Sequence, residues 1–498
     1  MPVKFKFSWA FLFLLQPLFT VAHYTFTPQL LKAQNDVFEL RLHEAQKIIE
    51  QELKSDPENR MIDLVQTYAE CSALNIDEDR TRYEHMLISF KTREQNTKGV
   101  DESSPYYLFN QAEKALQLAV LKLKFQDYVS AVFDVRNAYH ALEENIHAHP
   151  HFMLNYKTLG VMKTLIGTVP DSYKWALRIV GLEGDIVKGT AMLQRFINYP
   201  TKDEAVLLFQ KNARMQMAYL TLHVMKDKKL AWQQVDVLTK DYTTNLFSNW
   251  NRASFAMKCG YTDEAISTLQ QVPPATETYR FDYLHYLLGL AKLHRMDEDA
   301  DVYLKKYVEE FKGENYLKDA CLKLSWFYKI KGDYKQSDKY LEKVKTIGVA
   351  HLDEDKHAQK LAEQNEVQQI DLLKARMLCD GSYFLRAAAI LKPKQLSDFA
   401  IDKLKAEFLY RNGRIYHELN NTAKAIEYYK QCIDFAGKMP YYFAANSCLQ
   451  LGYIYEQLGY YQLAEVYFKQ CMHYTNHEYK NSLQQKAKTG LKRIEGRK

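Results

Sequence analysis

The stretch Leu451–Cys471, LGYIYEQLGYYQLAEVYFKQC, decides the fold, because Asn412–Cys432, NGRIYHELNNTAKAIEYYKQC, repeats its pattern without a slip. Small residues stand where two helices must approach each other, and large residues stand where helices interlock. Such self-similarity is typical of stacked helix–turn–helix units that share one continuous core. The matching pairs are Gly413 with Gly452, Tyr416 with Tyr455, Asn420 with Gly459, Ala425 with Ala464, Tyr429 with Phe468 and Cys432 with Cys471.

Weaker copies of this spacing precede the two units, so the repeat extends over most of the chain. Glycine (18) and proline (12) are scarce among the 498 residues, which favours long helices, and no alternating strand pattern occurs. The sequence therefore predicts an all-α fold, an α-solenoid of stacked helix–turn–helix repeats. The weaker copies are Ala33–Pro57, Ala253–Val272, Gly289–Leu304, Ser325–Val344 and Ala375–Leu391.

The spacing resembles the tetratricopeptide-repeat family, with the pair Leu451-Gly452 as its fullest match. The resemblance implies a superhelix whose concave face is lined by the first helix of each repeat and binds protein or peptide partners. Aromatic and arginine side chains on that helix suit interface anchors, although an ordinary surface role is the plainer interpretation of each. The lysine and asparagine arrangement with which such repeats clamp a C-terminal carboxylate is absent. The predicted partner-binding groove is Tyr410, Arg414, His417, Asn446, Tyr453 and Glu456.

The middle of the chain departs from simple repeats. An apolar helix opens at Gly160 and ends at Pro170, and a second one, Trp175–Asp185, ends in Gly-Leu-Glu-Gly-Asp before Gly189. This order resembles a signature of the inclusion-body-clearance family of tetratricopeptide-repeat proteins, whose members have no established catalytic activity. The resemblance implies the fold and an interaction role. Inclusion-body or lipid-related functions do not follow, because the family is mainly intracellular and this chain begins with an export pattern.

Residues 1–22 are predicted to form a secretory signal peptide. Lys4 and Lys6 make a basic start, Trp9–Leu15 an apolar core, and the small residues up to Ala22 a cleavage site, so the mature chain would begin near His23. The alternative is an uncleaved anchor, but the apolar run is shorter than the roughly 20 residues that span a bilayer. Export places the protein in the periplasm or cell envelope if the organism is a bacterium.

The expected organisation is one continuous stack rather than separate globular domains. The formal charge of +6 is small for this length, and no basic stripe indicates nucleic acid. Seven dispersed cysteines look like small core residues, although Cys432 and Cys448 lie on consecutive expected helices and a disulfide between them is the alternative. The expected segments are the signal peptide at 1–22, an N-terminal helical-repeat region at 23–245 with an apolar hairpin at 160–197, degenerate repeats at 246–351, a degenerate repeat and charged connection at 352–405, and two well-formed repeats with a C-terminal helix at 406–498.

Candidate metal and nucleotide sites are weak. Three alternating histidines fall in an expected loop before Met153, where nothing enforces convergence, and two more, four residues apart, are expected on one solvated helical face. The glycines that follow residue 180 lack the Gly-Lys-Ser/Thr order of a phosphate loop. No metal, cofactor or catalytic residue is therefore predicted. The residues are His147, His149 and His151, then His473 and His477, then Gly181, Gly184 and Gly189 with Lys188 and Thr190.

The hairpin at 160–197 has a second interpretation. Trp175 and Leu177, with Lys174 and Arg178 beside them, form an amphipathic pattern that would dock on a membrane surface. An apolar stripe at helical spacing is more often core, so we expect this face to pack inside the solenoid.

The sequence thus favours a non-catalytic exported scaffold that binds protein or peptide partners. One alternative is an envelope glycan-binding protein similar to the helical starch-utilisation outer-membrane proteins, which the five tryptophans and the lack of a lipid-attachment cysteine argue against. Others are a membrane-associated repeat protein and an enzyme that uses the repeats as a platform. The sequence fixes neither the partner nor the oligomeric state.

Overall fold

The computed structural model describes residues 22–95, 100–169, 174–274, 279–364, 368–477 and 479–496. Within these ranges the chain forms 25 α-helices and one short 3₁₀-helix, with no strand. The predicted all-α solenoid is therefore confirmed. The predicted leader lies outside the described residues, apart from Ala22. No helix in the described ranges is both long enough and apolar enough to cross a membrane.

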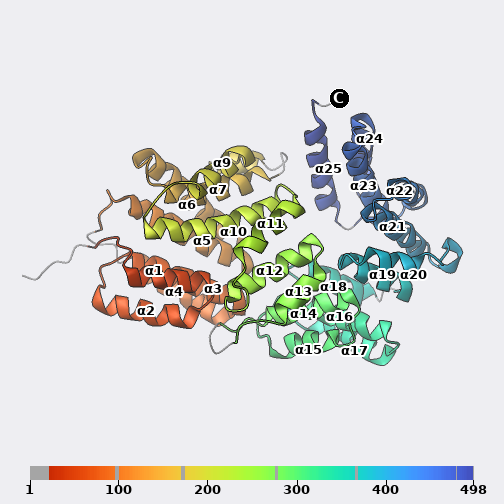
Figure 1. Cartoon of the computed structure of the whole chain (residues 1–498), viewed down its shortest axis with the longest axis horizontal. Helices are drawn as coiled ribbons and strands as arrows, with labels where there is room; N and C mark the ends of the chain where they lie inside the picture. The colour runs from red at the N-terminus through yellow and green to blue at the C-terminus, as the bar shows by residue number, and fades with distance from the viewer. Residues whose placement is uncertain are drawn as a thin grey trace, which may run out of the picture.

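The helices of the N-terminal half form antiparallel pairs. They are α1 (Pro28–Phe38), α2 (Leu42–Ser55), α3 (Met61–Asp77), α4 (Arg80–Gln95), α5 (Pro105–Lys124), α6 (Tyr128–Ala148), α7 (Leu154–Gly167), α8 (Lys174–Ile179), α9 (Ile186–Ile197), α10 (Glu204–His223), α11 (Lys228–Leu238), α12 (Leu246–Cys259) and α13 (Thr262–Leu269). Helices α1 to α4 lie at the lower left of Figure 1, α5 to α9 lie above them, and α10 to α13 cross the middle of the molecule.

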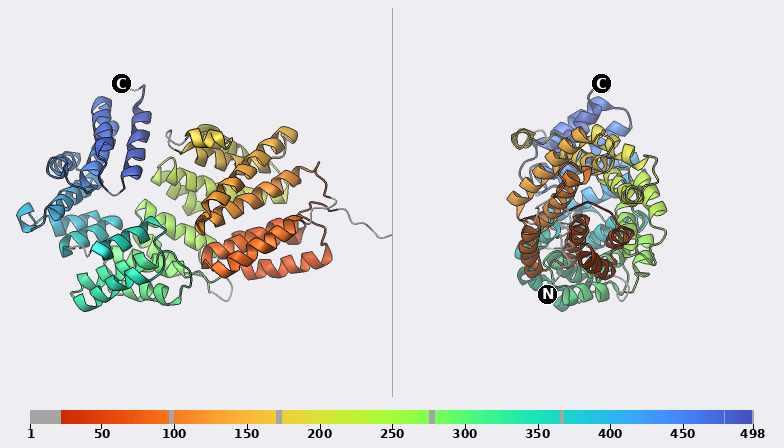
Figure 2. Two further views of the ribbon diagram at one scale, coloured as in Figure 1. Left: turned by 180° about the vertical axis from the view of Figure 1, so that it is seen from behind. Right: turned by 90° about the vertical axis from the view of Figure 1, so that its left-hand side faces the viewer.

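The C-terminal half continues in the same manner and ends on a single helix. Its elements are α14 (Tyr283–Arg295), α15 (Ala300–Glu310), α16 (Leu317–Ile330), α17 (Tyr334–Thr346), α18 (Asp353–Gln364), α19 (Ile370–Asp380), α20 (Phe384–Leu391), η2 (Leu396–Asp398), α21 (Asp402–Glu418), α22 (Thr422–Ala436), α23 (Phe443–Gln457), α24 (Tyr461–His473) and α25 (Lys480–Ile494). Seen from behind and end-on, the pairs wind about the long axis (Figure 2).

Turns between paired helices share one backbone conformation. The residue two positions before the second helix takes a left-handed conformation at Gly332 (φ 81°), Asn420 (φ 58°) and Gly459 (φ 79°), which glycine and asparagine adopt at low cost. A capping side chain then often accepts a backbone N–H three residues on, as Asp333 and Asn421 do. The sequence positions predicted as repeat turns are confirmed.

Helix pairs interlock where the repeat pattern predicted. A methyl group at Gly413 would lie 2.6 Å from the Tyr429 ring, and one at Gly452 would overlap the Phe468 ring. Each glycine therefore admits the aromatic ring of the second helix against the backbone of the first. One main core spans the fold from α1 to α19, and a second spans α19 to α25.

Glycines also explain the unusual middle segment, where α7 packs on α9 with almost no side chain between them. A methyl group at Gly160 would lie 2.8 Å from the Gly189 carbonyl oxygen, and one at Gly189 would lie 2.6 Å from the Gly160 oxygen and from the Thr164 nitrogen. A methyl group at Gly184 would likewise overlap the backbone of Gly167. These glycines serve helix packing, not phosphate binding.

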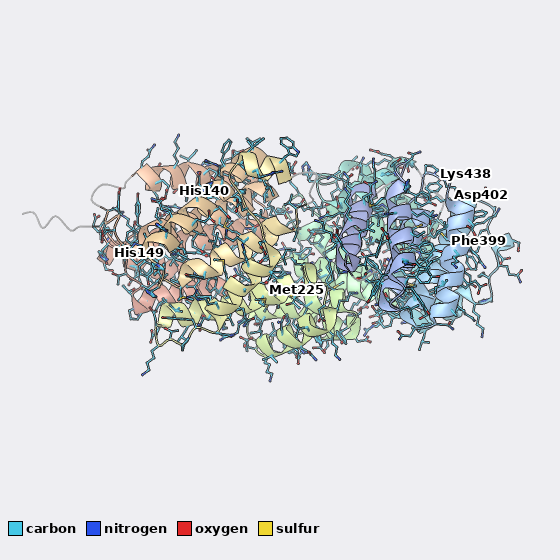
Figure 3. All side chains as sticks on the ribbon, turned by 90° about the horizontal axis from the view of Figure 1, so that it is seen from above. His140, His149, Met225, Phe399, Asp402 and Lys438 are labelled. Carbon is cyan, nitrogen blue, oxygen red and sulfur yellow. The ribbon has the colours of Figure 1, made fainter. Side chains whose placement is uncertain are left out.

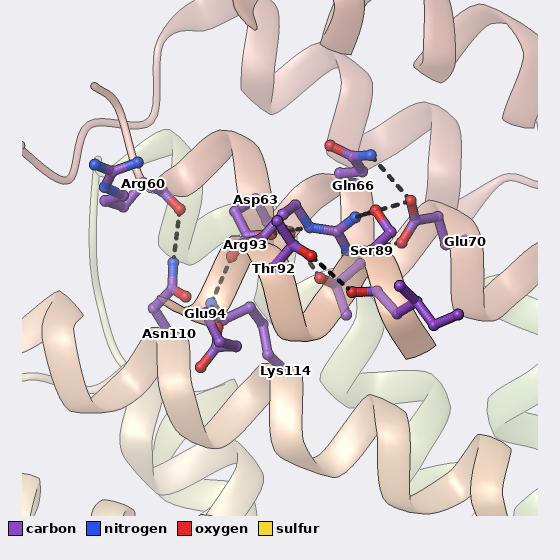
Figure 4. Close-up of polar contacts among 12 residues, drawn as sticks. Arg60, Asp63, Gln66, Glu70, Ser89, Thr92, Arg93, Glu94, Asn110 and Lys114 are labelled. Carbon is purple, nitrogen blue, oxygen red and sulfur yellow. Dashed lines mark hydrogen bonds and ion pairs between the residues drawn. The ribbon is translucent and has the colours of Figure 1, made fainter. Parts of the chain in front are cut away.

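An ionic network holds α4, which has few buried residues of its own, against α3 and α5 (Figure 4). The Arg93 guanidinium donates to Asp63 at 2.6 Å and to Glu70 at 2.8 Å. Lys114 donates to the other oxygen of Asp63 at 2.5 Å and also to Glu94. The network adds to the small apolar contact that Tyr83 and Met86 of α4 make with α3 and α5.

Contacts between distant parts of the chain close the superhelix. The Glu78 carboxylate accepts the backbone N–H groups of Glu314 (2.9 Å) and Asn315 (3.0 Å), which ties α3 to the loop before α16. Gln485 of α25 donates to the Thr168 carbonyl at 3.2 Å, which ties the last helix to the end of α7. Successive turns of the superhelix therefore touch, and the molecule is not an open spiral.

Candidate interaction surfaces

The six predicted groove residues lie on α21 and α23, the first helices of the last two pairs. Tyr410 is only 4% exposed, and its hydroxyl accepts a hydrogen bond from Asn446 Nδ2 at 2.7 Å. The structure thus brings these two residues together across neighbouring repeats. His417 is half-buried, its ring meets that of Tyr429 edge-on, and burial lowers its pKa.

Arg414 belongs to a charged cluster that sequence reasoning missed. Its Nη1 pairs at 3.0 Å with Asp380 of α19, and Arg376 approaches the same carboxylate from one turn away. Burial raises the pKa of Asp380, but Arg414 and Arg376 outweigh that effect and hold the pKa well below its usual range. The sequence signal that could have revealed this cluster was the pair of Arg376 and Asp380, four residues apart on α19, the first helix of the degenerate repeat.

The other end of this surface is covered by α25. Arg493 donates two hydrogen bonds to Glu456, at 2.9 and 2.7 Å, and its guanidinium lies 5.6 Å from the centre of the Tyr453 ring. Two predicted groove residues are therefore engaged by the chain's own last helix. The surface that α19, α21 and the start of α23 form is more accessible than the part of α23 that α25 covers.

A second contact of the C-terminal segment crosses this surface. The Tyr479 hydroxyl lies 3.2 Å from His357 Nδ1 on α18, and the Tyr479 ring meets Tyr442 edge-on at 5.4 Å. Burial, together with the positive charge of Arg376, lowers the pKa of His357 to about 3, so the imidazole is neutral at physiological pH.

Sequence reasoning also missed two cavities in the N-terminal half. The larger, about 220 Å³, is lined by residues of α1, α3, α5, α7, α10 and α12, each the first helix of its pair. A smaller one of about 40 Å³ adjoins it and shares Phe38, Asn212 and Phe247 with it. No local pattern marks the two cavities, because their walls come from seven helices far apart in the sequence.

The histidine clusters differ from the sequence expectation. His147 lies in the last turn of α6 rather than in a loop, and His149 caps that helix at the outer end of the N-terminal half (Figure 3). His473 ends α24, and the chain is extended at its cap, so His477 does not share a helical face with it. That prediction was wrong, because helical spacing holds only inside a helix.

One other group has metal-ligand spacing in the described part of the chain. Asp282, His285 and Glu310 offer ligand atoms within 4.8 Å of one another. Arg280, however, pairs with Asp282 at 2.7 Å and with Glu310 at 2.9 Å. The carboxylates therefore already have a cation, and the group is a salt-bridge cluster.

The seven cysteines are all free thiols, so the alternative of a disulfide between Cys432 and Cys448 is not what the structure shows. Six are buried, and Cys259 is half-buried. Burial raises the pKa of the Cys432 thiol to about 12. The thiols act as small core residues, as expected.

The expectation that the mid-chain hairpin packs inside the solenoid is only half right. Leu177 packs on the core, but Trp175 is 59% exposed and Ile179 is 75% exposed on the short helix α8. A six-residue helix lying on one surface cannot bury both of its faces. Arg136 Nε donates to the Val180 carbonyl at 3.1 Å, so this exposed apolar surface adjoins the outer face of α6.

Comparisons with known proteins bear on the repeats. The model of the tetratricopeptide repeat matches residues 318–347, 406–438 and 445–474. Yeast Tom70 is similar in structure, with a TM-score of 0.34 and 14% identity over 88% of each chain. A human IFIT1 dimer with PPP-AAAA gives a TM-score of 0.34 and 15% identity over 83% of this chain and 96% of that one. No match was found among curated protein sequences. The three segments that match the repeat model coincide with the pairs α16 and α17, α21 and α22, and α23 and α24. The C-terminal half of this all-helical solenoid therefore contains tetratricopeptide repeats.

Proposed function

We propose that the chain is a non-catalytic, exported scaffold that binds protein or peptide partners on the concave face of its superhelix. One observation carries the proposal. The inner helices α19, α21 and α23 of successive repeats present Arg376, Arg414, Tyr442 and Asn446 on one surface, each half-buried. Arginine, tyrosine and asparagine in such a setting combine contact area with directional hydrogen bonds, as interface anchors do.

Lack of catalysis is part of the proposal. The charged groups of this surface pair with one another, as in Arg414 with Asp380 and Arg493 with Glu456. A general acid or base would instead stand free at a cavity with its pKa near the working pH. We also propose that the middle of the chain is related to the inclusion-body-clearance family, and the close packing of α7 on α9 supports this relation.

Export is the remaining part. The basic start, apolar core and small residues of 1–22 support a cleaved leader, with the periplasm or envelope as compartment in a bacterium. The proposed mature start is compatible with the fold. The His23 backbone N–H donates to the Glu58 carbonyl, and the His23 carbonyl accepts from Arg60 N–H, so the residue is fixed in the structure.

The test is in-cell cross-linking of the tagged full-length chain, with mass spectrometry of its N-terminus and of cross-linked peptides. We expect a start near His23 and cross-links from one partner to α19, α21 and α23. Arg414→Glu and Asn446→Leu should each remove that partner. The matched control is Lys438→Glu, a change at an exposed loop position labelled in Figure 3. Partner recovery unaffected by both groove variants would refute the concave-face site, and an intact Met1 would refute export.

A second candidate function, peripheral membrane docking, is favoured by the exposed apolar surface around α8. Large apolar side chains gather there on four neighbouring helices, and exposed Arg178 and Lys188 add positive charge that suits anionic headgroups. The apolar residues are Val129 and Phe133 on α6, Leu165 on α7, Trp175 and Ile179 on α8, and Ile186 and Val187 on α9.

Sedimentation with phosphatidylcholine vesicles, with and without phosphatidylglycerol, tests this candidate. The wild-type chain should sediment with the anionic vesicles, and the triple variant Trp175→Ser, Ile179→Ser, Val187→Ser should not. Leu385→Ser is the matched control, because this residue on α20 is equally exposed and lies outside the surface. Equal sedimentation of the triple variant and the wild type would exclude docking through α8.

A further inference from the structure

The two adjoining cavities of the N-terminal half lie outside the matched repeats, and the helices that line the larger one are all first helices. The larger cavity, about 220 Å³, equals the share of liquid volume of roughly seven water molecules. That space suits one large side chain with its flanking peptide groups. The smaller cavity continues it past Phe38, Asn212 and Phe247, which line both.

Charged groups in the walls already have partners. Lys157 Nζ lies 3.1 Å from Glu113 Oε2, and these side chains are 2% and 1% exposed. The hydroxyls of Tyr68 and Thr158 donate to the same carboxylate. In the smaller cavity Lys211 pairs with Glu39 at 3.1 Å. A charged ligand would lose its hydration without gaining a free counter-ion, so the walls select an uncharged one.

Uncharged hydrogen-bonding groups remain for a ligand. Ser72, Asn212 and Gln216 line the larger cavity, and Gln117, which also lines it, already bonds to the Tyr68 hydroxyl. Gln216 Oε1 is buried and has no hydrogen-bond partner among the described residues. A carboxamide both donates and accepts, as a peptide group does, so Asn212 and Gln216 suit a ligand with backbone amides.

The rest of the lining is apolar. Phe38, Leu116, Val161 and Phe247 line the larger cavity, and the smaller one adds Leu208, Met215 and Leu238. A lipid tail would leave the carboxamides without partners, and a sugar would place hydroxyls against apolar walls. An apolar side chain flanked by backbone amides satisfies both kinds of surface.

From this lining we infer that the two cavities form one binding site for an uncharged, apolar segment of a partner peptide. The apolar side chain enters the larger cavity against Phe38 and Phe247, and the backbone of the segment hydrogen-bonds to Asn212 and Gln216. This inference rests on the proposed peptide-binding function and gives the N-terminal half a recognition site of its own, separate from the charged surface of α19 to α23.

The probe is a library of N-acetylated, C-amidated pentapeptides of Gly, Ser, Asn, Gln, Val, Leu, Met and Phe, with a second library that replaces Ser and Gln by Lys and Glu. Binding to the full chain is followed by fluorescence anisotropy and by the methyl resonance of Met215, which lines the site. Neutral peptides should bind and shift that resonance. Asn212→Leu and Gln216→Leu, on the surface of one helix, should each weaken binding at least tenfold.

Lys438→Glu, at an exposed loop position outside both surfaces, is the control and should leave this binding unchanged. If Asn446→Leu weakens binding while the two α10 variants do not, the inference fails and the proposed function stands. If both libraries bind equally, or neither binds, the inference also fails. The proposed function is judged separately, by the cross-linking of the partner to α19, α21 and α23. Unchanged circular dichroism of the α10 variants shows that they fold.

Discussion

Gly189→Ala should destabilise the contact between α7 and α9, although alanine is the better helix former. The new methyl carbon would lie 2.6 Å from the Gly160 oxygen and the Thr164 nitrogen, whereas ordinary contacts begin at 3.4 Å. Helix α9 must therefore retreat by about 0.8 Å, and a gap of that size forfeits a quarter to a half of the dispersion attraction across it. Overpacking of this kind costs up to about 3 kcal/mol, and helix propensity returns about 1 kcal/mol. The expected net loss is about 2 kcal/mol.

The assay is amide hydrogen exchange of residues 154–197, because repeat proteins open locally and a single global transition would hide the effect. Exchange in α7 and α9 should be accelerated by roughly 30-fold, which is what 2 kcal/mol corresponds to. Ala191→Gly is the control. It lies on the exposed face of α9 and should cost about 1 kcal/mol from propensity alone, without affecting α7. Slower exchange in Gly189→Ala would refute the close approach, since propensity would then dominate.

Three further results are expected. Arg93→Leu should lower the local stability of α4 by about 1 to 2 kcal/mol, because Glu70 loses its cation and Asp63 keeps only Lys114, and limited proteolysis should cut first within residues 80–95. His294→Gln should flatten the pH dependence of the urea midpoint. Burial lowers the pKa of His294 from 6.5 to about 4, so stability present above pH 6.5 is lost as pH falls towards 4, on the order of 3 kcal/mol. Cys259 should be the first thiol to react with a disulfide reagent, and Cys259→Ser should remove that fast phase.

Each of these has a contrary outcome. Cleavage of the Arg93→Leu protein outside α4 would show that the ionic network does not hold that helix. An unchanged pH slope in His294→Gln would mean that the imidazole is solvated in the native state. Rapid reaction of more than one thiol would contradict the burial of the other six cysteines, and a Cys259→Ser protein that keeps the fast phase would assign it elsewhere.

Much of the local structure was predictable, because the two helices of a repeat pack through residues of that same repeat. The pairs Gly413 with Tyr429 and Gly452 with Phe468 are local matches of a small to a large residue, and they predicted the interlocking that the structure shows. The turn at Asn420 followed from the same pattern. These features depend on residues fewer than about 20 apart, where spacing in sequence determines spacing in space.

The candidate sites were predictable only in part. Arg414 and Asn446 lie on the first helices of their pairs, and the groove remains a prediction, whereas the Asp380 partner of Arg414 comes from a degenerate repeat with no clear pattern. The prediction for His477 failed because α24 ends four residues earlier, and the prediction that Trp175 is buried failed because α8 is short. A hydrophobic pattern gives the direction of a side chain but not whether another element covers it.

The sequence by itself determined that the chain is helical, where its repeats turn and which faces interlock, since these depend on local steric fit. The tertiary structure alone decided how the superhelix closes. Glu78 meets Glu314 and Asn315, and Gln485 meets Thr168, across hundreds of residues. The larger inner cavity likewise draws on six helices at once. The reason is cumulative: each pair adds a small rotation to the stack, and only the sum of those rotations brings distant residues together.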